Sequence, residues 1–197
     1  MAAGGLALKA FPSPDGAELR DDDELARFER VILPHLDAAY NLARWLTRND
    51  HDAEDVVQEA CLRAHQFFGG FHGSDGRAWM LRVVRNTCYT WLERNRPRAP
   101  ALAFDDDKHS AADQGASPLS LTLRDENVEM VRRAIEQLSL EYREVIVLRE
   151  LEGFSYKDIA SVAEIPPGTV MSRLARARER LQQALAGHAS EEPRREL

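Results

Sequence analysis

Arginine side chains near the C-terminal end of the chain have the type and spacing needed to read nucleic acid. Between Pro166 and Gln182, four arginines accompany a single acid, Glu179. The polar and cationic residues of this stretch recur at helical spacing and share one helix face. They are Thr169, Ser172, Arg173, Arg176 and Arg180. Because guanidinium groups donate to base edges and phosphates, such a face is typical of a helix in the DNA major groove. The alternative is an amphipathic helix with a solvated basic face.

Two helices meeting at a corner must position these side chains. Ser155 and Asp158 predict a capping box at the start of the first helix. Pro166 and Pro167 end that helix and suit the first turn of the next one. The buried stripe of the second helix consists of Val170, Leu174, Ala177, Leu181 and Leu185. The pattern therefore predicts a helix-turn-helix.

A second group of cations lies between Arg77 and Arg98, where six arginines accompany one acid, Glu93. Three aromatic residues are interleaved with them: Trp79, Tyr89 and Trp91. Cations that follow a backbone, combined with rings that stack on bases, are what single-stranded nucleic acid binding requires. The alternative is that the tryptophans belong to the core and the arginines form a solvated face.

The segment before this helix, Phe68 to Gly76, is rich in glycine and has aromatic residues at one end. Its composition predicts a binding loop. It lacks the Gly-Lys-Ser/Thr ending of a phosphate-binding loop, so we do not interpret it as one.

Helical periodicity extends through most of the chain, and no segment alternates like a strand, so we expect an all-α fold. One helix should begin near Glu24 and break at Pro34, and another should follow a turn and N-cap at residues 49–52. The apolar stripe of that second helix includes Ala53, Val57, Ala60, Ala64 and Phe67. A further helix is expected from Arg77 to Arg94, and helical spacing resumes at Val128 until Gly153 supplies a stop.

These elements predict two small helical domains joined by a flexible linker. The expected divisions are a flexible N-terminal tail at 1–23, a domain at 24–96, a linker at 97–124, a domain at 125–187 and a C-terminal tail at 188–197. The linker assignment depends on three prolines and an acidic run, Asp105 to Asp107.

The overall composition limits the possible functions. The 197 residues include 33 acids and 26 lysines and arginines, which gives a net charge of -7. This balance argues against a protein that coats nucleic acid unaided, so DNA binding should be local or assisted by a partner. No apolar run is long enough to span a membrane and no signal peptide is evident, so we expect a cytoplasmic protein.

Cys61, His65 and Cys88 offer a third, enzymatic interpretation as a metal or redox site. Cys61 and His65 lie four residues apart on one helix face, but the set falls short of the four clustered ligands of a structural zinc site. We therefore expect reduced core cysteines, with no metal, no cofactor and no catalytic residue.

Four motifs in a fixed order give the chain a resemblance to a known family. They are residues 53–59 (AEDVVQE), 79–86 (WMLRVVRN), 142–145 (YREV) and 165–174 (IPPGTVMSRL). Over nearly all of residues 25–185, the chain resembles bacterial sigma factors of the extracytoplasmic-function (ECF) type, within the sigma-70 family.

The resemblance implies a transcription initiation factor that binds core RNA polymerase and directs it to specific promoters. The second helix of the N-terminal domain would dock on the clamp helices of the largest polymerase subunit, with further contact at the flap. The polymerase-binding residues would be Glu54, Asp55, Gln58 and Glu59.

The resemblance also divides the DNA-binding residues between two promoter elements. The melted −10 element would be held by Phe71, His72, Arg77, Trp79, Arg82, Arg85 and Asn86. The −35 element would be read as a duplex by Pro167, Gly168, Thr169, Ser172, Arg173 and Arg176.

This chain departs from the family pattern at three positions. The family often has an acid at position 90 and a cation at position 93, where this chain has Thr90 and Glu93. At the corner Glu164 replaces the usual glycine, which costs on the order of 1 kcal/mol if the backbone there is left-handed. The resemblance further implies an anti-sigma factor as a partner. The alternative function is a sigma-like decoy or regulatory output module that binds an anti-sigma factor without opening promoters.

Overall fold

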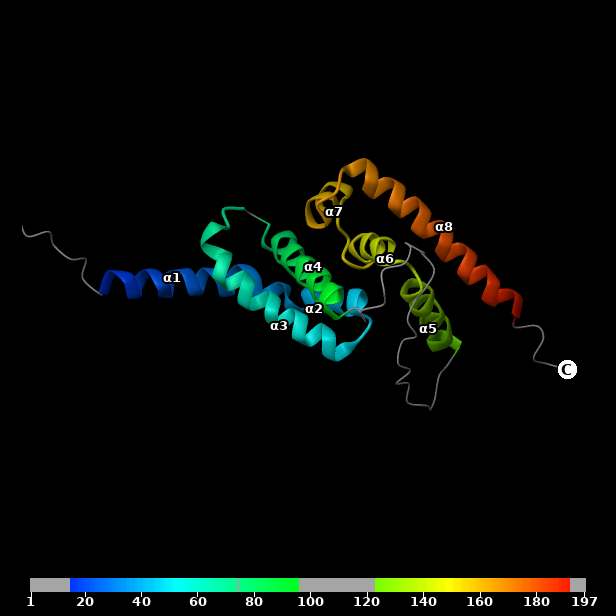
Figure 1. Ribbon diagram of the computed structural model, residues 1–197, viewed down its shortest axis with the longest axis horizontal. Helices are drawn as coiled ribbons and strands as arrows, with labels where there is room; N and C mark the ends of the chain where they lie inside the picture. The colour runs from blue at the N-terminus through cyan, green and yellow to red at the C-terminus, as the bar shows by residue number, and fades with distance from the viewer. Residues whose placement is uncertain (1–14, 74, 96–122, 192–197) are drawn as a thin grey trace, which may run out of the picture.

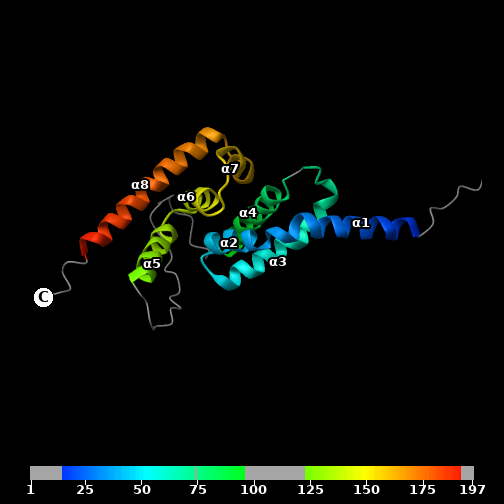
Figure 2. The same ribbon diagram turned by 180° about the vertical axis from the view of Figure 1, so that it is seen from behind.

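The structure is a computed structural model that describes residues 15–73, 75–95 and 123–191. These residues form helices and turns, with no strand among them, which confirms the all-α prediction. The N-terminal part contains α1 (Asp15–Ile32), α2 (Leu36–Thr47), α3 (Asp50–Phe67) and α4 (Gly76–Asn95). The C-terminal part contains α5 (Leu123–Glu136), α6 (Leu140–Ile146), α7 (Tyr156–Ala163) and α8 (Pro167–Glu191), as Figure 1 and Figure 2 show from opposite sides.

Local sequence signals explain several helix boundaries of the N-terminal part. Pro34 lies in a 3₁₀ turn, Leu33–His35, that separates α1 from α2 as predicted. The Asn49 side chain caps α3 by accepting a hydrogen bond from the Asp52 backbone N–H at 3.1 Å. The turn and cap expected at residues 49–52 are therefore confirmed.

The ends of the chain are more helical than the sequence suggested. The predicted helix start near Glu24 was wrong, because α1 already begins at Asp15. The run Ala-Glu-Leu-Arg at 17–20 consists of good helix formers, and a segment poor in core residues still forms a helix when its propensity is high. At the other end, α8 continues into the predicted tail as far as Glu191. The expected tail residues 1–14 and 192–197 lie outside the described part of the chain.

The expected linker falls almost wholly on residues that the structure does not describe, 96–122. Its last two residues, Leu123 and Arg124, belong to α5, which begins five residues before the expected start at Val128.

The predicted apolar stripe of α3 was right at the three alanines and at Val57, which is half-buried and packs against the core, but wrong at Phe67. Val56 is fully buried beside Val57, and Phe68 is buried instead of Phe67. Phe67 is 63% exposed, whereas Phe68 is 1% exposed. The helix ends at Phe67 and a 3₁₀ turn, Phe68–Gly70, follows, so the change of backbone geometry directs Phe68 into the core.

The start of α7 has the predicted capping box, and Glu164 forms the corner between α7 and α8. The Ser155 side chain accepts from the Asp158 backbone N–H, and the Asp158 carboxylate accepts from the Ser155 backbone N–H. Glu164 ends α7 in the left-handed region, with φ 56°. Gly153, with φ 70°, follows the π-helical turn Val147–Leu151 that extends α6, so it supplies the predicted stop.

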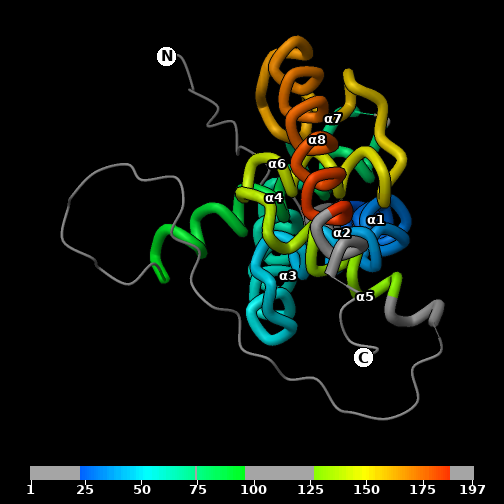
Figure 3. The backbone as a smooth tube through the Cα atoms, turned by 90° about the vertical axis from the view of Figure 1, so that its right-hand side faces the viewer, coloured from blue at the N-terminus to red at the C-terminus, as the bar shows by residue number. Residues whose placement is uncertain are grey.

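The two helical parts pack against each other. α4 contacts α7 and α2 contacts α6, so that α6 and α7 lie along the side of the N-terminal bundle (Figure 1 and Figure 3). One contiguous cluster of buried apolar residues extends through both parts. Within the described residues, none of the helices is both long enough and apolar enough to cross a membrane.

Gly76 is required where α4 passes α1. A Cβ atom at this position would lie 2.6 Å from both the carbonyl oxygen and a side-chain methyl of Val31. We predict that Gly76→Ala lowers the free energy of unfolding by about 1–3 kcal/mol, because backbone must move to relieve the clash. Urea unfolding measures the change. Gly70→Ala is the control, since a Cβ there has no neighbour within 4 Å and the change should stay within about 0.5 kcal/mol. Equal stabilities of the two variants would contradict this account.

Candidate nucleic-acid interface

The first turns of α8 carry the residues predicted to bind the −35 element. Four of these six residues are exposed: Pro167, Gly168, Ser172 and Arg176. Thr169 and Arg173 are half-buried, and Arg173 donates to Glu141 Oε2 at 3.0 Å. The structure therefore brings all six together at the start of one helix, with Arg173 held in place by an acid of α6.

The remaining arginines of α8 differ in their surroundings. Arg178 pairs with Glu150 at 2.7 Å, and Arg180 lies over the Tyr142 ring at 4.7 Å from its centroid. Arg176 makes no hydrogen bond or ion pair with the described residues. Of the three, Arg176 is thus the side chain that is fully available to a duplex.

An aromatic cluster supports the predicted −10 loop from inside. The Phe71 ring is buried and lies 5.7 Å from the Phe68 ring and 5.1 Å from the Trp79 ring, centroid to centroid. Trp79 is half-buried, and Phe28 of α1 completes the cluster at 5.2 Å from Phe68. Two of the predicted base-stacking residues therefore serve as packing for the loop in this structure, while His72 is exposed.

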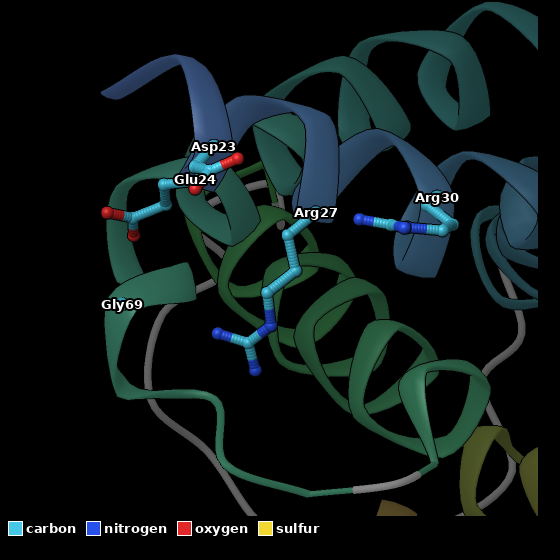
Figure 4. A pocket seen from close by; sticks show the side chains of 5 residues that line it. All are labelled: Asp23, Glu24, Arg27, Arg30 and Gly69. Carbon is cyan, nitrogen blue, oxygen red and sulfur yellow. The ribbon is translucent and has the colours of Figure 1, made fainter. Parts of the chain in front are cut away.

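Arg27 of α1 anchors the same loop, and the sequence analysis did not identify it. Its guanidinium donates to the Phe71 carbonyl oxygen at 2.7 Å and lies 5.0 Å from the Phe68 ring centroid. Figure 4 shows Arg27 extending from α1 across an open pocket. The pocket is lined by Asp23, Glu24, Arg27, Arg30 and Gly69. Arg27 lies 44 positions before Phe71 in the sequence. Helical periodicity does not reveal contacts between residues so far apart, so the sequence could not show this one.

The polar side chains of α4 meet an acid from α6. Arg85 Nε donates to Glu144 Oε1 at 2.7 Å, and the Tyr89 hydroxyl donates to Glu144 Oε2 at 2.9 Å. Arg85 also donates to Asn86 Oδ1 at 3.0 Å and lies 4.0 Å from the Tyr89 ring centroid. Glu144 is 0% exposed, so its carboxylate depends on these donors for its hydrogen bonds.

A second acid of the C-terminal part contacts the start of α4. Arg77 Nη2 donates to Glu152 Oε2 at 2.5 Å, and Asn41 of α2 donates to Glu152 Oε1 at 2.5 Å. The Arg77 guanidinium also lies 4.7 Å from the Phe154 ring centroid. Arg82, in contrast, is half-buried and makes no hydrogen bond or ion pair with the described residues.

Burial at this contact alters the ionisation of its groups. Burial raises the pKa of the Glu144 carboxyl, and the charge and hydrogen bond of Arg85 oppose that rise. Burial also acts to lower the pKa of Arg85, but the attraction of Glu144 outweighs it and the pKa is raised. Burial and the charge of Arg48 lower the pKa of Arg143 to about 10, and Arg143 donates to the Glu136 carbonyl at 2.8 Å. The contact therefore holds several ionisable groups out of water.

Sequence reasoning missed Glu144 and Glu152 as partners of the predicted −10 residues. Glu144 stands directly before the apolar run from Val145 to Leu148, and that run is buried. A charge next to a buried apolar run was the one local signal for a buried ion pair, although the identity of its partner could not be read from it.

The predicted polymerase-binding residues share one exposed face of α3. Glu54, Asp55 and Gln58 are exposed, while Glu59 is half-buried and pairs with Arg63. Leu62 continues the same face one turn further and is 69% exposed. An acidic helix face with an exposed leucine is suited to a protein partner.

The cysteines and His65 do not form a cluster of ligands. Cys88 is buried in the core and Cys61 is half-buried, while the His65 ring packs edge-on against Phe28 at 5.3 Å. Among the described residues, no group of three or more His, Cys, Asp or Glu side chains is arranged to hold a metal ion.

Both helical parts match regions of one known protein family. Residues 31–98 match the family model of sigma-70 region 2, and residues 128–181 match that of sigma-70 region 4. The sigma-H factor of Pseudomonas aeruginosa RNA polymerase is 34% identical over 165 residues, which cover 80% of this chain and 86% of that protein. This chain belongs to the ECF sigma factors of the sigma-70 family. Sigma factors of this group direct RNA polymerase to promoters and are not enzymes.

Other relatives agree with this assignment. The ECF sigma-E factor of Escherichia coli is 36% identical over 135 residues, 65% of this chain and 71% of that protein. Among solved structures, the sigma factor RpoE of Bartonella quintana, in complex with the anti-sigma factor NepR, superposes with a TM-score of 0.62. It is 33% identical, and the match covers 81% of this chain and 97% of that one. CnrH, in complex with the cytosolic domain of CnrY, shares the fold, with a TM-score of 0.59 at 23% identity.

The two thiols of this sigma factor should differ strongly in reactivity. Burial raises the pKa of Cys88 to about 12 from an ordinary 9.0, so its thiolate fraction falls by about a thousandfold. Burial also raises the pKa of Cys61, which is only half-buried. We predict that a thiol reagent at pH 8 labels Cys61 in the native protein and reaches Cys88 only after denaturation. Stopped-flow absorbance measures both rates, and Cys61→Ser should remove the native phase. Two equal native rates would contradict this.

Proposed function

We propose that this sigma factor docks on core RNA polymerase through α3, captures the melted −10 strand with the loop before α4 and with α4 itself, and reads the −35 duplex with α8. The observation that carries the proposal is the presence of two groups of arginines, one on α4 and one on α8, each within a part that matches the corresponding sigma region. The functional units correspond to residues 24–96 and 125–187, with α1 extending the first.

The docking proposal depends on the acidic face of α3. Asp55 and Gln58 project from it beside Glu54 and Glu59, and none of these four is buried. A cationic surface on the clamp helices of the largest polymerase subunit would complement this face, with the flap as a second contact of the C-terminal unit. Charge complementarity of this kind favours specificity and fast association.

The −10 proposal depends on cations and rings that lie on adjoining elements. Arg77, Arg82, Arg85 and Asn86 are spaced along α4, and His72 lies in the loop that precedes it. Opening a promoter unstacks bases at a cost of a few kcal/mol, which contacts to the displaced strand must offset. The cluster of Phe71 and Trp79 supports the loop that would hold the extruded base.

The −35 proposal depends on the exposed start of α8. The helix follows a corner formed by the left-handed Glu164 and by Pro166 and Pro167, so Ser172, Arg173 and Arg176 are presented at the start of a helix. Arg173 would exchange Glu141 for a base or a phosphate when DNA binds.

We also infer that an anti-sigma factor binds this protein in the cytoplasm. The inference draws on the similar RpoE of Bartonella quintana, whose structure was solved with the anti-sigma factor NepR. Binding of purified candidate anti-sigma proteins from the same genome, measured by calorimetry, tests it.

Transcription by reconstituted holoenzyme tests the main proposal. Core polymerase with and without this protein is incubated with genomic DNA, and the 5′ ends of the RNA products are sequenced. We expect discrete start sites that require the protein and share two sequence blocks upstream. The absence of protein-dependent start sites would contradict the proposed function and would favour a decoy role.

Replacing Arg176 should weaken recognition of the upstream duplex specifically. We predict that Arg176→Ala lowers the affinity of holoenzyme for a promoter duplex by about 1–3 kcal/mol, with the loss concentrated at one base pair of the −35 block. Filter binding to a set of single-base promoter variants measures it. Arg178→Ala is the matched control on the same helix, because Arg178 is engaged with Glu150. Equal losses for the two variants would refute the assignment.

Replacing the acidic face of α3 should reduce polymerase binding without affecting the fold. We predict that Asp55→Ala combined with Gln58→Ala weakens association with core polymerase by at least about tenfold, since both side chains are exposed and would lie in the contact. Fluorescence anisotropy measures the affinity, and thermal melting should be unchanged. Glu29→Ala, at an exposed acid of α1, is the control. Unchanged polymerase affinity in the double variant would rule out this docking face.

A further inference from the structure

Two acids of the C-terminal part occupy cations that the proposed function assigns to the −10 strand. Glu144 accepts from Arg85 and Glu152 accepts from Arg77, across a contact between segments 59 and 75 positions apart. Both acids are buried, and the Arg85 side chain is only 15% exposed. In this arrangement neither arginine presents its full set of donors to solvent.

The acids contact the donors in the way that a nucleic acid backbone would. A carboxylate and a phosphate both offer two adjacent acceptor oxygens to a guanidinium. Glu144 uses one oxygen for Arg85 and the other for the Tyr89 hydroxyl, and Glu152 divides its oxygens between Arg77 and Asn41. The Phe154 ring lies against the Arg77 guanidinium, 4.7 Å from Cζ to the ring centroid, and a nucleic acid base offers a guanidinium the same kind of flat π face.

We propose that this structure is a closed state of the sigma factor, in which the C-terminal unit covers the −10 face of α4 and its Glu144 and Glu152 substitute for DNA phosphates. The proposal rests on the proposed function, since it assumes that Arg77 and Arg85 bind promoter DNA. A segment of the same chain, from α6 through Phe154, covers this face of α4. DNA and this segment therefore cannot bind the face at the same time.

The contact is suited to reversible opening. Ion pairs and hydrogen bonds join the two units at both acids, beside the apolar packing of α4 on α7, and the polar contacts can be exchanged for equivalent ones with DNA and water.

Two paired substitutions test the closure in the full-length protein. Glu144→Gln with Glu152→Gln removes both charges from the contact without touching any proposed DNA-binding residue. Glu129→Gln with Glu150→Gln removes the same number of charges from acids that pair within the C-terminal unit, so it is the matched control. Single-molecule energy transfer between dyes at Gln66 on α3 and Gln182 on α8, both exposed, reports the separation of the units. Anisotropy of a fluorescein-labelled single-stranded DNA of random sequence reports access to the face.

We expect high energy transfer in the wild type and in the control, and low transfer in the Glu144→Gln/Glu152→Gln protein. The same protein should bind the single-stranded DNA on the order of tenfold more tightly than the control, because apparent affinity scales with the fraction of molecules that are open. Unchanged energy transfer would overturn the closure while leaving the proposed function to the transcription experiment. Opening without tighter DNA binding would overturn the masking of the −10 face.

A substitution on the other side of the contact distinguishes opening of the two units from misfolding. Asn41→Asp places a carboxylate opposite Glu152, and Asn41 belongs to neither proposed DNA-binding set. Energy transfer should fall in this variant as well, with the helical circular dichroism of the full-length protein unchanged. Retention of the wild-type transfer in a folded Asn41→Asp protein would also overturn the closure.

Discussion

The buried carboxylate of Glu144 is the constraint on which the arrangement of the two helical parts depends. A charge that is 0% exposed is tolerated only with close partners of opposite charge or with strong donors. Its two donors, Arg85 and Tyr89, come from α4 of the other helical part. Glu152 repeats the same kind of contact with Arg77 and Asn41. Because these polar contacts flank the packing of α4 on α7, they fix how the region 4 unit lies on the region 2 unit.

This arrangement leaves the functional surfaces in different states. The acidic face of α3 and the start of α8 are exposed, so they are open to polymerase and to duplex DNA as they stand. Arg77 and Arg85 of α4 are engaged within the protein. In this account, the surface that needs a melted strand is the one held covered until the units separate, and the strand is melted only on the polymerase. The net charge of -7 agrees with a protein whose DNA binding depends on its partner.

Local chemistry made much of the fold predictable from the sequence, and long-range contacts set the limit. The Asn49 cap, the break at Pro34 and the Ser155 capping box all depend on neighbouring residues, so the sequence was enough for them. The burial of Phe68 instead of Phe67 depended on the 3₁₀ turn after α3, which helical spacing alone does not resolve. The membership in the ECF sigma factors followed from four ordered motifs. The partners of Arg77 and Arg85 come from segments far along the chain, and no periodicity connects them.

The distance between spin labels on α3 and α8 tests the central claim most directly, when it is measured by pulsed electron resonance in the free protein and in its complex with core polymerase. The account predicts one short, narrow distance distribution in the free protein and a clearly longer distance on the polymerase. The same distance in both states, or a broad distribution in the free protein, would contradict it.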